Sequence, residues 1–241
     1  MSSLTRFFLG DAQYAKGSYY LKDENILKHA RKVLRLQKGS RVELFDGKGK
    51  TILSEIELLT KEVLVAKIIE EKVSDDSKKL HITLAQALPK AGKIDNILRM
   101  NTEIGVSGFV LFESDHSIVK KEHYKEQKII RLNKIIQEAS RQSRNDYIPQ
   151  ITGPIEFQKM LSTDSDRKIL LHTDSAGEKL SDIKMSLKKN SSIVVCVGPE
   201  GGFSKTEVQS ALTKGFQIVK LDLPVLRTET VGLVVCSYLL I

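Results

Sequence analysis

The chain has 241 residues, of which 41% are hydrophobic and 28% charged, as in ordinary globular proteins. This composition excludes a disordered or collagen-like chain, and the longest apolar stretch, Val231–Ile241, is too short to span a bilayer. The net charge of +8 and the pI of ≈ 9.3 favour a phosphate-rich partner, and we expect a cytoplasmic protein that does not enter a membrane.

Residues 1–73 have the short alternating patterns that are typical of β-strands. A helix is predicted at Asp23–Leu36, with Asp23 as its N-cap. Strands are predicted at Arg41–Phe45, Ile52–Leu59 and Glu62–Ile69. Asp46-Gly47 is a turn signal between the first two strands. We therefore expect a small β-barrel with one helix.

A polar segment, Val73–Lys79, reads as a linker, and strands then alternate with helices. The predicted strands are Leu80–Leu88, Gly108–Phe112, Lys168–His172, Ser192–Val197 and Gln217–Asp222. The predicted helices are Lys93–Ile104, Glu122–Arg144, Ser204–Lys214 and Thr228–Leu240. This alternation predicts an α/β domain with a largely parallel sheet, whose ligands bind outside the carboxyl ends of the strands. Three such ends carry candidate functional residues: Leu170–Asp174, Val197–Gly202 and Leu221–Thr230.

Two basic clusters stand out in the chain. The segment Lys28–Arg41 holds six Lys and Arg residues and no carboxylate, and Lys128–Arg144 holds five against the single Glu138. Either cluster alone could be a solvated face. Together, in a chain of pI ≈ 9.3, they favour binding to a nucleic-acid backbone.

The turn Gly198–Phe203 follows a buried strand and precedes a capping-box pattern at Ser204–Glu207. Glycines allow a tight turn and a close approach of the backbone to a ligand. The sequence lacks the closing Gly-Lys-Ser/Thr of a Walker loop and the Gly-x-Gly-x-x-Gly dinucleotide fingerprint. A structural turn would explain the glycines, but Glu200 between them has no evident packing role.

Leu226–Thr230 opens the last helix, where Thr228 suits an N-cap and Glu229 complements the helix dipole. Arg227 fits neither role, so it is either a surface residue or an arginine that faces an anion beside the glycine-rich turn.

The two cysteines, Cys196 and Cys236, lie among Val and Ile residues and read as core residues of a reducing compartment. No disulfide framework is expected. The spacing of Cys and His residues matches no metal motif, so we expect no metal.

Gly198–Phe203 together with Leu226–Thr230 resembles the ribosomal RNA small-subunit methyltransferase E family, which belongs to the SPOUT superfamily. The resemblance covers the whole chain, in one order. Further matching segments are Arg6–Phe8, His29 with Val33–Leu36, Leu44–Gly49, Gln86–Lys90, Thr102–Val106, Glu138-Ala139 and Gln142-Ser143.

The resemblance implies an α/β fold: a PUA-like RNA-binding β-barrel domain at residues 1–73, and a SPOUT methyltransferase domain at 74–241 with a deep C-terminal trefoil knot. It implies a homodimer that binds S-adenosylmethionine in the knot. The implied reaction is methylation of N3 of one uridine in the decoding-region helix of 16S rRNA, in the small ribosomal subunit.

The chemistry of the implied reaction suggests functional roles for residues of this chain. Arg227 would stabilise the uridinate-like oxygen, and Glu200 or Glu229 would accept the proton or orient a water; Glu229 could equally serve only its own helix. His172 could be a base, although a backbone contact to the donor is the simpler role. The donor would contact Leu171, His172, Gly198, Pro199, Gly201, Gly202, Leu221, Leu223 and Leu226. RNA phosphates would contact Arg6, Arg31, Lys32 and Arg35 of the first domain, and Arg141 and Arg144 of the second.

Two other functions fit the same sequence. The glycine-rich turn could hold a nucleotide phosphate in an enzyme of another class, which binding of ATP in place of S-adenosylhomocysteine would reveal. Alternatively, the protein could be an RNA-binding ribosome assembly factor without activity.

Overall fold

A computed structural model describes residues 4–76, 79–90, 92–173 and 177–241. The chain forms two compact units. The first comprises the chain up to Asp75 together with Ser140–Tyr147, and the second comprises Asp76–Ala139 and Ile148–Ile241. The boundary expected after residue 73 stays a proposal, and residues 77–78 of the predicted linker lie outside the described ranges.

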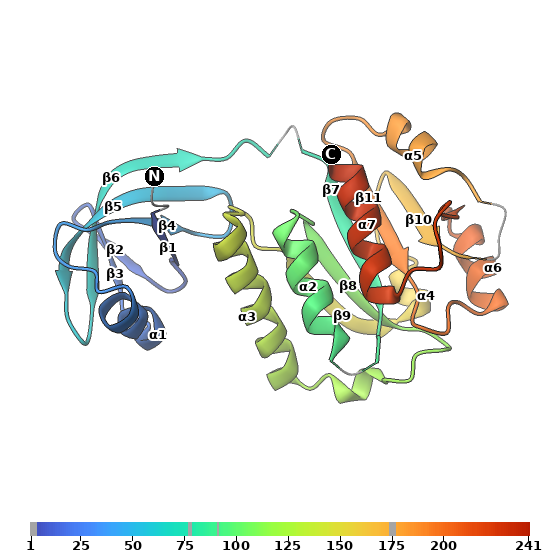
Figure 1. Cartoon of the computed structure of the whole chain (residues 1–241), viewed down its shortest axis with the longest axis horizontal. Helices are drawn as coiled ribbons and strands as arrows, with labels where there is room; N and C mark the ends of the chain where they lie inside the picture. Colours follow the sequence, from blue (N-terminus) through green and yellow to red (C-terminus); the bar gives the residue numbers. More distant parts are fainter. Residues whose placement is uncertain (1–3, 77–78, 91, 174–176) are drawn as a thin grey trace. The chain divides into compact units, whose positions relative to one another are not determined.

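The first unit is built on a six-stranded mixed sheet with the order β1-β4-β5-β6-β3-β2 (Figure 1). The strands are β1 (Thr5–Phe8), β2 (Gln13–Ala15), β3 (Ser18–Leu21), β4 (Arg41–Phe45), β5 (Lys50–Leu59) and β6 (Leu64–Val73). Strand β1 pairs with β4 in parallel, and the other pairs are antiparallel. The last three strands confirm the sequence prediction. Strands β1, β2 and β3 have only three or four residues each. Such short segments do not show the alternation of apolar and polar residues from which a strand is predicted, so the sequence analysis did not identify them.

The predicted helix of the first unit is α1 (Glu24–Lys28), which continues into a π-helical turn, η1 (His29–Val33). The Asp23 carboxylate accepts a hydrogen bond from the Ile26 N–H at 2.9 Å, which confirms the N-cap. Arg35 adopts a left-handed backbone conformation with φ 51°, so the helix ends before Leu36.

Arg6 is part of the core of the first unit and not of its surface. It is only 3% exposed, its guanidinium lies 4.1 Å from the centre of the Phe45 ring, and it pairs with Glu43 at 3.0 Å and Asp146 at 2.5 Å. A buried cation with two carboxylate partners is unavailable to a phosphate, so the RNA contact expected of Arg6 does not fit this geometry.

The segment Ser140–Tyr147 completes the first unit. Arg141 donates to the Arg6 carbonyl at 3.5 Å, and Arg144 donates to the Leu4 carbonyl at 2.9 Å. The sequence interpretation assigned these two arginines to the catalytic domain. The structure corrects this: they lie at the end of a helix that begins in the second unit and finishes in the first.

The second unit contains a six-stranded parallel sheet with the order β12-β10-β11-β7-β8-β9 (Figure 1). Its strands are β7 (His81–Ala87), β8 (Gly108–Glu113), β9 (Gln150–Glu156), β10 (Arg167–Leu171), β11 (Ser192–Val197) and β12 (Gln217–Val219). All five strand pairs are parallel, which confirms the predicted fold class. The sequence analysis did not predict β9, and it predicted that β12 ends at Asp222, three residues after its actual end at Val219.

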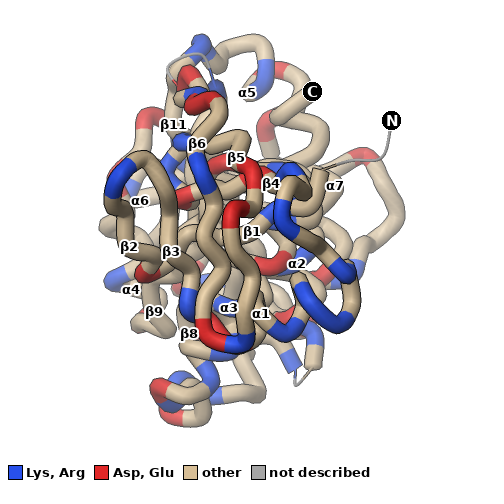
Figure 2. The backbone as a smooth tube through the Cα atoms, turned by 90° about the vertical axis from the view of Figure 1, so that its left-hand side faces the viewer, with Lys and Arg blue, Asp and Glu red and all other residues tan. Residues whose placement is uncertain are grey.

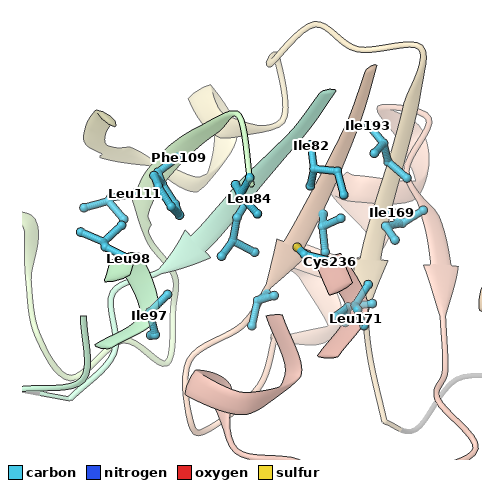
Figure 3. Close-up of a cluster of buried hydrophobic side chains, with 14 of the residues drawn as sticks. Ile82, Leu84, Ile97, Leu98, Phe109, Leu111, Ile169, Leu171, Ile193 and Cys236 are labelled. Carbon is cyan, nitrogen blue, oxygen red and sulfur yellow. The ribbon is translucent and has the colours of Figure 1, made fainter. Parts of the chain in front are cut away.

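Helices cover both faces of this sheet. They are α2 (Lys93–Glu103), η2 (Lys121–His123), α3 (Glu126–Ser143), α4 (Phe157–Met160), α5 (Leu180–Ser186), α6 (Lys205–Thr213) and α7 (Thr228–Leu240). Side chains of α2, α3, α5 and α7 share one core with Ile82 and Leu84 of β7, and α4 and α6 share the other with Ala85 and Ala87. Figure 3 shows the first core, from Leu98 of α2 to Cys236 of α7. Cys196 and Cys236 are buried, as expected of core residues, and neither forms a disulfide in the described part of the chain.

The path of the chain after β11 positions the C-terminal helix. From β11 the chain passes beyond β10 to β12 at the edge of the sheet, and residues 220–227 then lead back to α7, which contacts α2, β7 and β11. The trefoil knot stays a prediction. Within the described ranges, no helix is both long and apolar enough to cross a membrane.

Candidate functional site

The three predicted strand ends meet in one cavity of about 560 Å³ in the second unit. A volume of this size suits a small organic ligand. All nine residues expected at the donor line the cavity, as do Glu200, Arg227 and Lys93. Asp174 of the first strand end lies outside the described residues. The cavity follows from the parallel sheet, because neighbouring parallel strands end at the same edge.

The glycine-rich turn after β11 is held by the loop that follows β8. His116 Nδ1 lies 3.0 Å from the Gly201 carbonyl oxygen and 3.2 Å from that of Gly202. Gly202 has φ +69°, where a side chain is strained, whereas a Cβ at Gly201 would meet the His116 Cβ at 3.1 Å. Gly202 therefore allows the backbone conformation of the turn, and Gly201 allows the turn to pack against His116.

Helix α6 begins directly after this turn with the capping box that the sequence predicts. Ser204 and Glu207 exchange hydrogen bonds of 2.9 and 3.2 Å between side chain and backbone. The buried Glu207 carboxylate also accepts from Ser114 Oγ at 3.1 Å and from the Asp115 N–H at 3.0 Å. The loop after β8 and the start of α6 therefore fix the glycine-rich turn together.

The first turn of α7 is tied to the same turn by Thr228. The Thr228 hydroxyl donates to the Gly198 carbonyl at 2.7 Å and accepts from Gln86 Nε2 at 2.9 Å. Thr228 is buried and is the first helical residue, so its predicted role as N-cap is wrong. Arg227 is the N-cap residue, and its carbonyl accepts the Thr230 and Val231 N–H groups at 2.9 Å. Its side chain takes no part in capping and lines the cavity.

Glu200 and Glu229, the two candidate proton acceptors, share one cation. Lys93 Nζ lies 3.0 Å from Glu200 Oε1 and 2.9 Å from Glu229 Oε2. Partial burial raises the pKa of each carboxyl, but backbone N–H groups and Lys93 outweigh it, so both pKa values lie below their ordinary range. The carboxylates, Glu229 first, raise the pKa of Lys93. At neutral pH all three groups are charged, and neither carboxylate has the raised pKa that favours a general base.

The sequence interpretation did not identify Lys93. It is the first residue of α2, where a positive charge is unfavourable because the positive end of the helix dipole lies there. This unfavourable position is the feature of the sequence that could have indicated a functional role for Lys93. Glu200 also has a structural partner that the sequence did not reveal, because it accepts from the Lys90 N–H at 3.2 Å.

The predicted RNA-binding residues lie in the first unit, whereas the cavity lies in the second. Lys32 and Arg35 are exposed and Arg31 is half-buried. Figure 2 shows Lys and Arg in blue along α1 and the segment that follows it. In the described part of the chain, no group of three His, Cys, Asp or Glu residues could hold a metal ion.

Comparison with known proteins identifies relatives along the whole chain. Residues 76–240 match a family model described as an RNA methyltransferase domain, and residues 21–69 match one described as an RNA methyltransferase PUA domain. A ribosomal RNA small subunit methyltransferase E of Aquifex aeolicus is 33% identical over 226 residues, which cover 93% of this chain and 95% of that protein. Its namesake in Bacillus subtilis is 29% identical over 216 residues, covering 87% and 84%.

A solved structure shares the fold over nearly the full length. It is that of a ribosomal RNA small subunit methyltransferase E from Neisseria gonorrhoeae, bound to S-adenosyl methionine. The TM-score is 0.84 at 29% identity, over 98% of this chain and 96% of that chain.

Replacing Thr228 tests the link between α7 and the glycine-rich turn. Thr228→Val keeps the shape of the side chain but leaves the Gly198 carbonyl without its donor, so we expect a loss of about 1–3 kcal/mol in the free energy of unfolding. Thr228→Ser, which keeps the hydroxyl, should retain most of that stability. Urea unfolding of both variants measures the difference, and equal stability of the Val and wild-type proteins would contradict the assigned role.

Proposed function

Because the chain belongs to the ribosomal RNA small subunit methyltransferase E family, we propose that it methylates N3 of one uridine of 16S rRNA with S-adenosylmethionine as donor. The observation that carries the proposal is the cavity at the ends of β10 and β11 and in the 220–227 loop, which gathers all nine expected donor residues. The relative bound to S-adenosyl methionine supports the choice of donor.

The cavity fits such a donor in size and chemistry. Apolar side chains, among them Leu171, Leu223 and Leu226, line it beside the backbone of the glycine-rich turn. Apolar walls suit an adenine ring, and exposed backbone groups can read its edges. When bound, S-adenosylmethionine supplies a methyl group activated by its sulfonium.

Arg227 is the residue that we propose acts on the acceptor. Methylation requires the N3–H proton to leave, which places negative charge on the uracil carbonyl oxygens. The Arg227 guanidinium, at a residue that lines the cavity at the start of α7, would stabilise that charge. Since Glu200 and Glu229 have lowered pKa values, a proton taken up by either carboxylate passes on to water.

RNA binding is assigned to the segment after α1. Arg31, Lys32 and Arg35 are proposed to contact phosphates, which positions the RNA without reading its sequence. Arg35 lies in a left-handed conformation that costs about 1–2 kcal/mol for residues other than glycine, so packing alone does not explain an arginine there. Arg141 and Arg144 are proposed to extend this surface from the end of α3.

The protein is proposed to act as a homodimer. Helix α7 is apolar along most of its length, and its residue Tyr238 is exposed. An apolar face of this kind needs a cover, which a second copy can supply. A monomer in sedimentation equilibrium at micromolar concentration would contradict the proposal.

Single-turnover methyl transfer tests the reaction and the role of Arg227. Wild-type protein should transfer one methyl group to N3 of a single uridine in small subunits that lack the modification. Arg227→Ala should slow this step by about two to three orders of magnitude and change the affinity for S-adenosylhomocysteine only a few-fold. Arg227→Lys should recover part of the rate, because a flexible ammonium lacks the planar guanidinium fork.

Two results would count against these assignments. If wild-type protein transfers no methyl group to small subunits, the proposed activity fails. If Arg227→Ala loses donor affinity and rate together, Arg227 shapes the pocket and does not act on the acceptor.

The salt dependence of RNA binding tests the basic segment. Replacing Arg31, Lys32 and Arg35 with Ala should lower the slope of log K against log [salt] by about 0.9 for each duplex phosphate that the variant no longer neutralises. Affinity for S-adenosylhomocysteine should not change. Lys61→Ala and Lys67→Ala, at exposed positions near and within β6, provide the control and should leave the slope near that of the wild type. An unchanged slope in the triple variant would place the RNA elsewhere.

A further inference from the structure

Lys93 joins three parts of the second unit that are far apart in the sequence. It begins α2, Glu200 lies in the turn after β11, and Glu229 lies in the first turn of α7. The Lys93 Nζ is 3.0 Å from one carboxylate and 2.9 Å from the other, and the three side chains are 27%, 23% and 21% exposed. An ion pair withdrawn from water to this degree is screened less than a surface pair.

The contacts around Lys93 close a ring. Glu200 is also fixed by the Lys90 N–H, and Thr228, the neighbour of Glu229, holds the Gly198 carbonyl. The donor turn and the first turn of α7 are therefore linked twice, once through the Thr228 hydroxyl and once through Lys93. Arg227 directly precedes Thr228, which forms the first of these links.

We propose that Lys93 is a positioning residue for binding of the methyl donor, which holds the glycine-rich donor turn against the start of α7. The inference rests on the proposed function. It assigns Lys93 no contact with the transferred methyl group.

The charge balance of the cluster makes this role testable. Two carboxylates face one ammonium, and removing the ammonium leaves two like charges that repel. The other charged or titratable groups that line the cavity are Arg227, Lys220 and His172. Because His172 is present in every variant, comparison with the wild type cancels its contribution.

The experiment measures affinity for S-adenosylhomocysteine by calorimetry between about pH 5 and 8. Lys93→Met should bind about tenfold more weakly than wild type at pH 8, and the deficit should shrink as the pH falls and one carboxylate takes up a proton. Lys93→Arg keeps the cation and should remain within about threefold of wild type. The double variant Lys93→Met/Glu229→Gln has one carboxylate left, so it should lose the added pH dependence and recover the part of the affinity that repulsion costs. It should stay weaker than wild type, because the ammonium that links the turn to α7 is still absent. Lys205→Met removes an exposed lysine from the same helix position, the first residue of α6, and should match the wild type.

Two results would overturn the proposal. Lys93→Met could bind like wild type at every pH, or it could bind equally weakly at every pH without recovery in the double variant, as expected if only packing were impaired. If Lys93→Met does not fold, the affinities of Lys93→Arg and of the double variant are compared with that of the wild type over the same pH range. Binding of S-adenosylhomocysteine requires no methyl transfer, so inactivity of the wild type on small subunits would refute the proposed function and leave this result standing.

Discussion

The cavity of the second unit depends on how closely α7 lies against the parallel sheet. A Cβ at Gly232 would stand 3.3 Å from a methyl group of Leu84, so the helix approaches β7 to a distance that leaves little room for a side chain. At the start of the same helix, the Thr228 hydroxyl is shared by Gln86 and Gly198. Both contacts are buried, and they fix the helix along its axis and toward the sheet. The positions of Leu226, Arg227, Thr228 and Val231 around the cavity follow from them.

This arrangement separates two tasks in the molecule. The parallel sheet supplies rigid strand ends, and the loops beyond them carry the groups that face a ligand. The positively charged segment after α1 lies in the other unit, whose core is formed by a different sheet. The residues proposed to bind a polyanion therefore differ from those that line the cavity, and substitutions can address each set separately.

Local signals allowed much of this structure to be predicted. The alternation of Arg41–Phe45 and the capping residues Asp23 and Ser204 depend on neighbours in the sequence, and all are confirmed. Contacts between segments that are distant in the sequence could not be predicted from such local patterns. The expectation that Arg6 binds a phosphate failed because its carboxylate partner Asp146 follows α3, 140 residues further along the chain. The bridging role of Lys93 depends on two carboxylates that only the folded sheet brings together.

The return of Ser140–Tyr147 to the first unit has a consequence for synthesis of the protein. Tyr147 packs on Gly49 so closely that a Cβ there would collide with its hydroxyl oxygen, and Asp146 pairs with Arg6. When residue 75 leaves the ribosome, the sheet of the first unit is complete in sequence, but its buried arginine still lacks one counter-ion. That unit reaches its final state only after α2, β8 and α3 have been translated. The two halves of the molecule thus mature in an interleaved order, although their sheets occupy separate stretches of the chain.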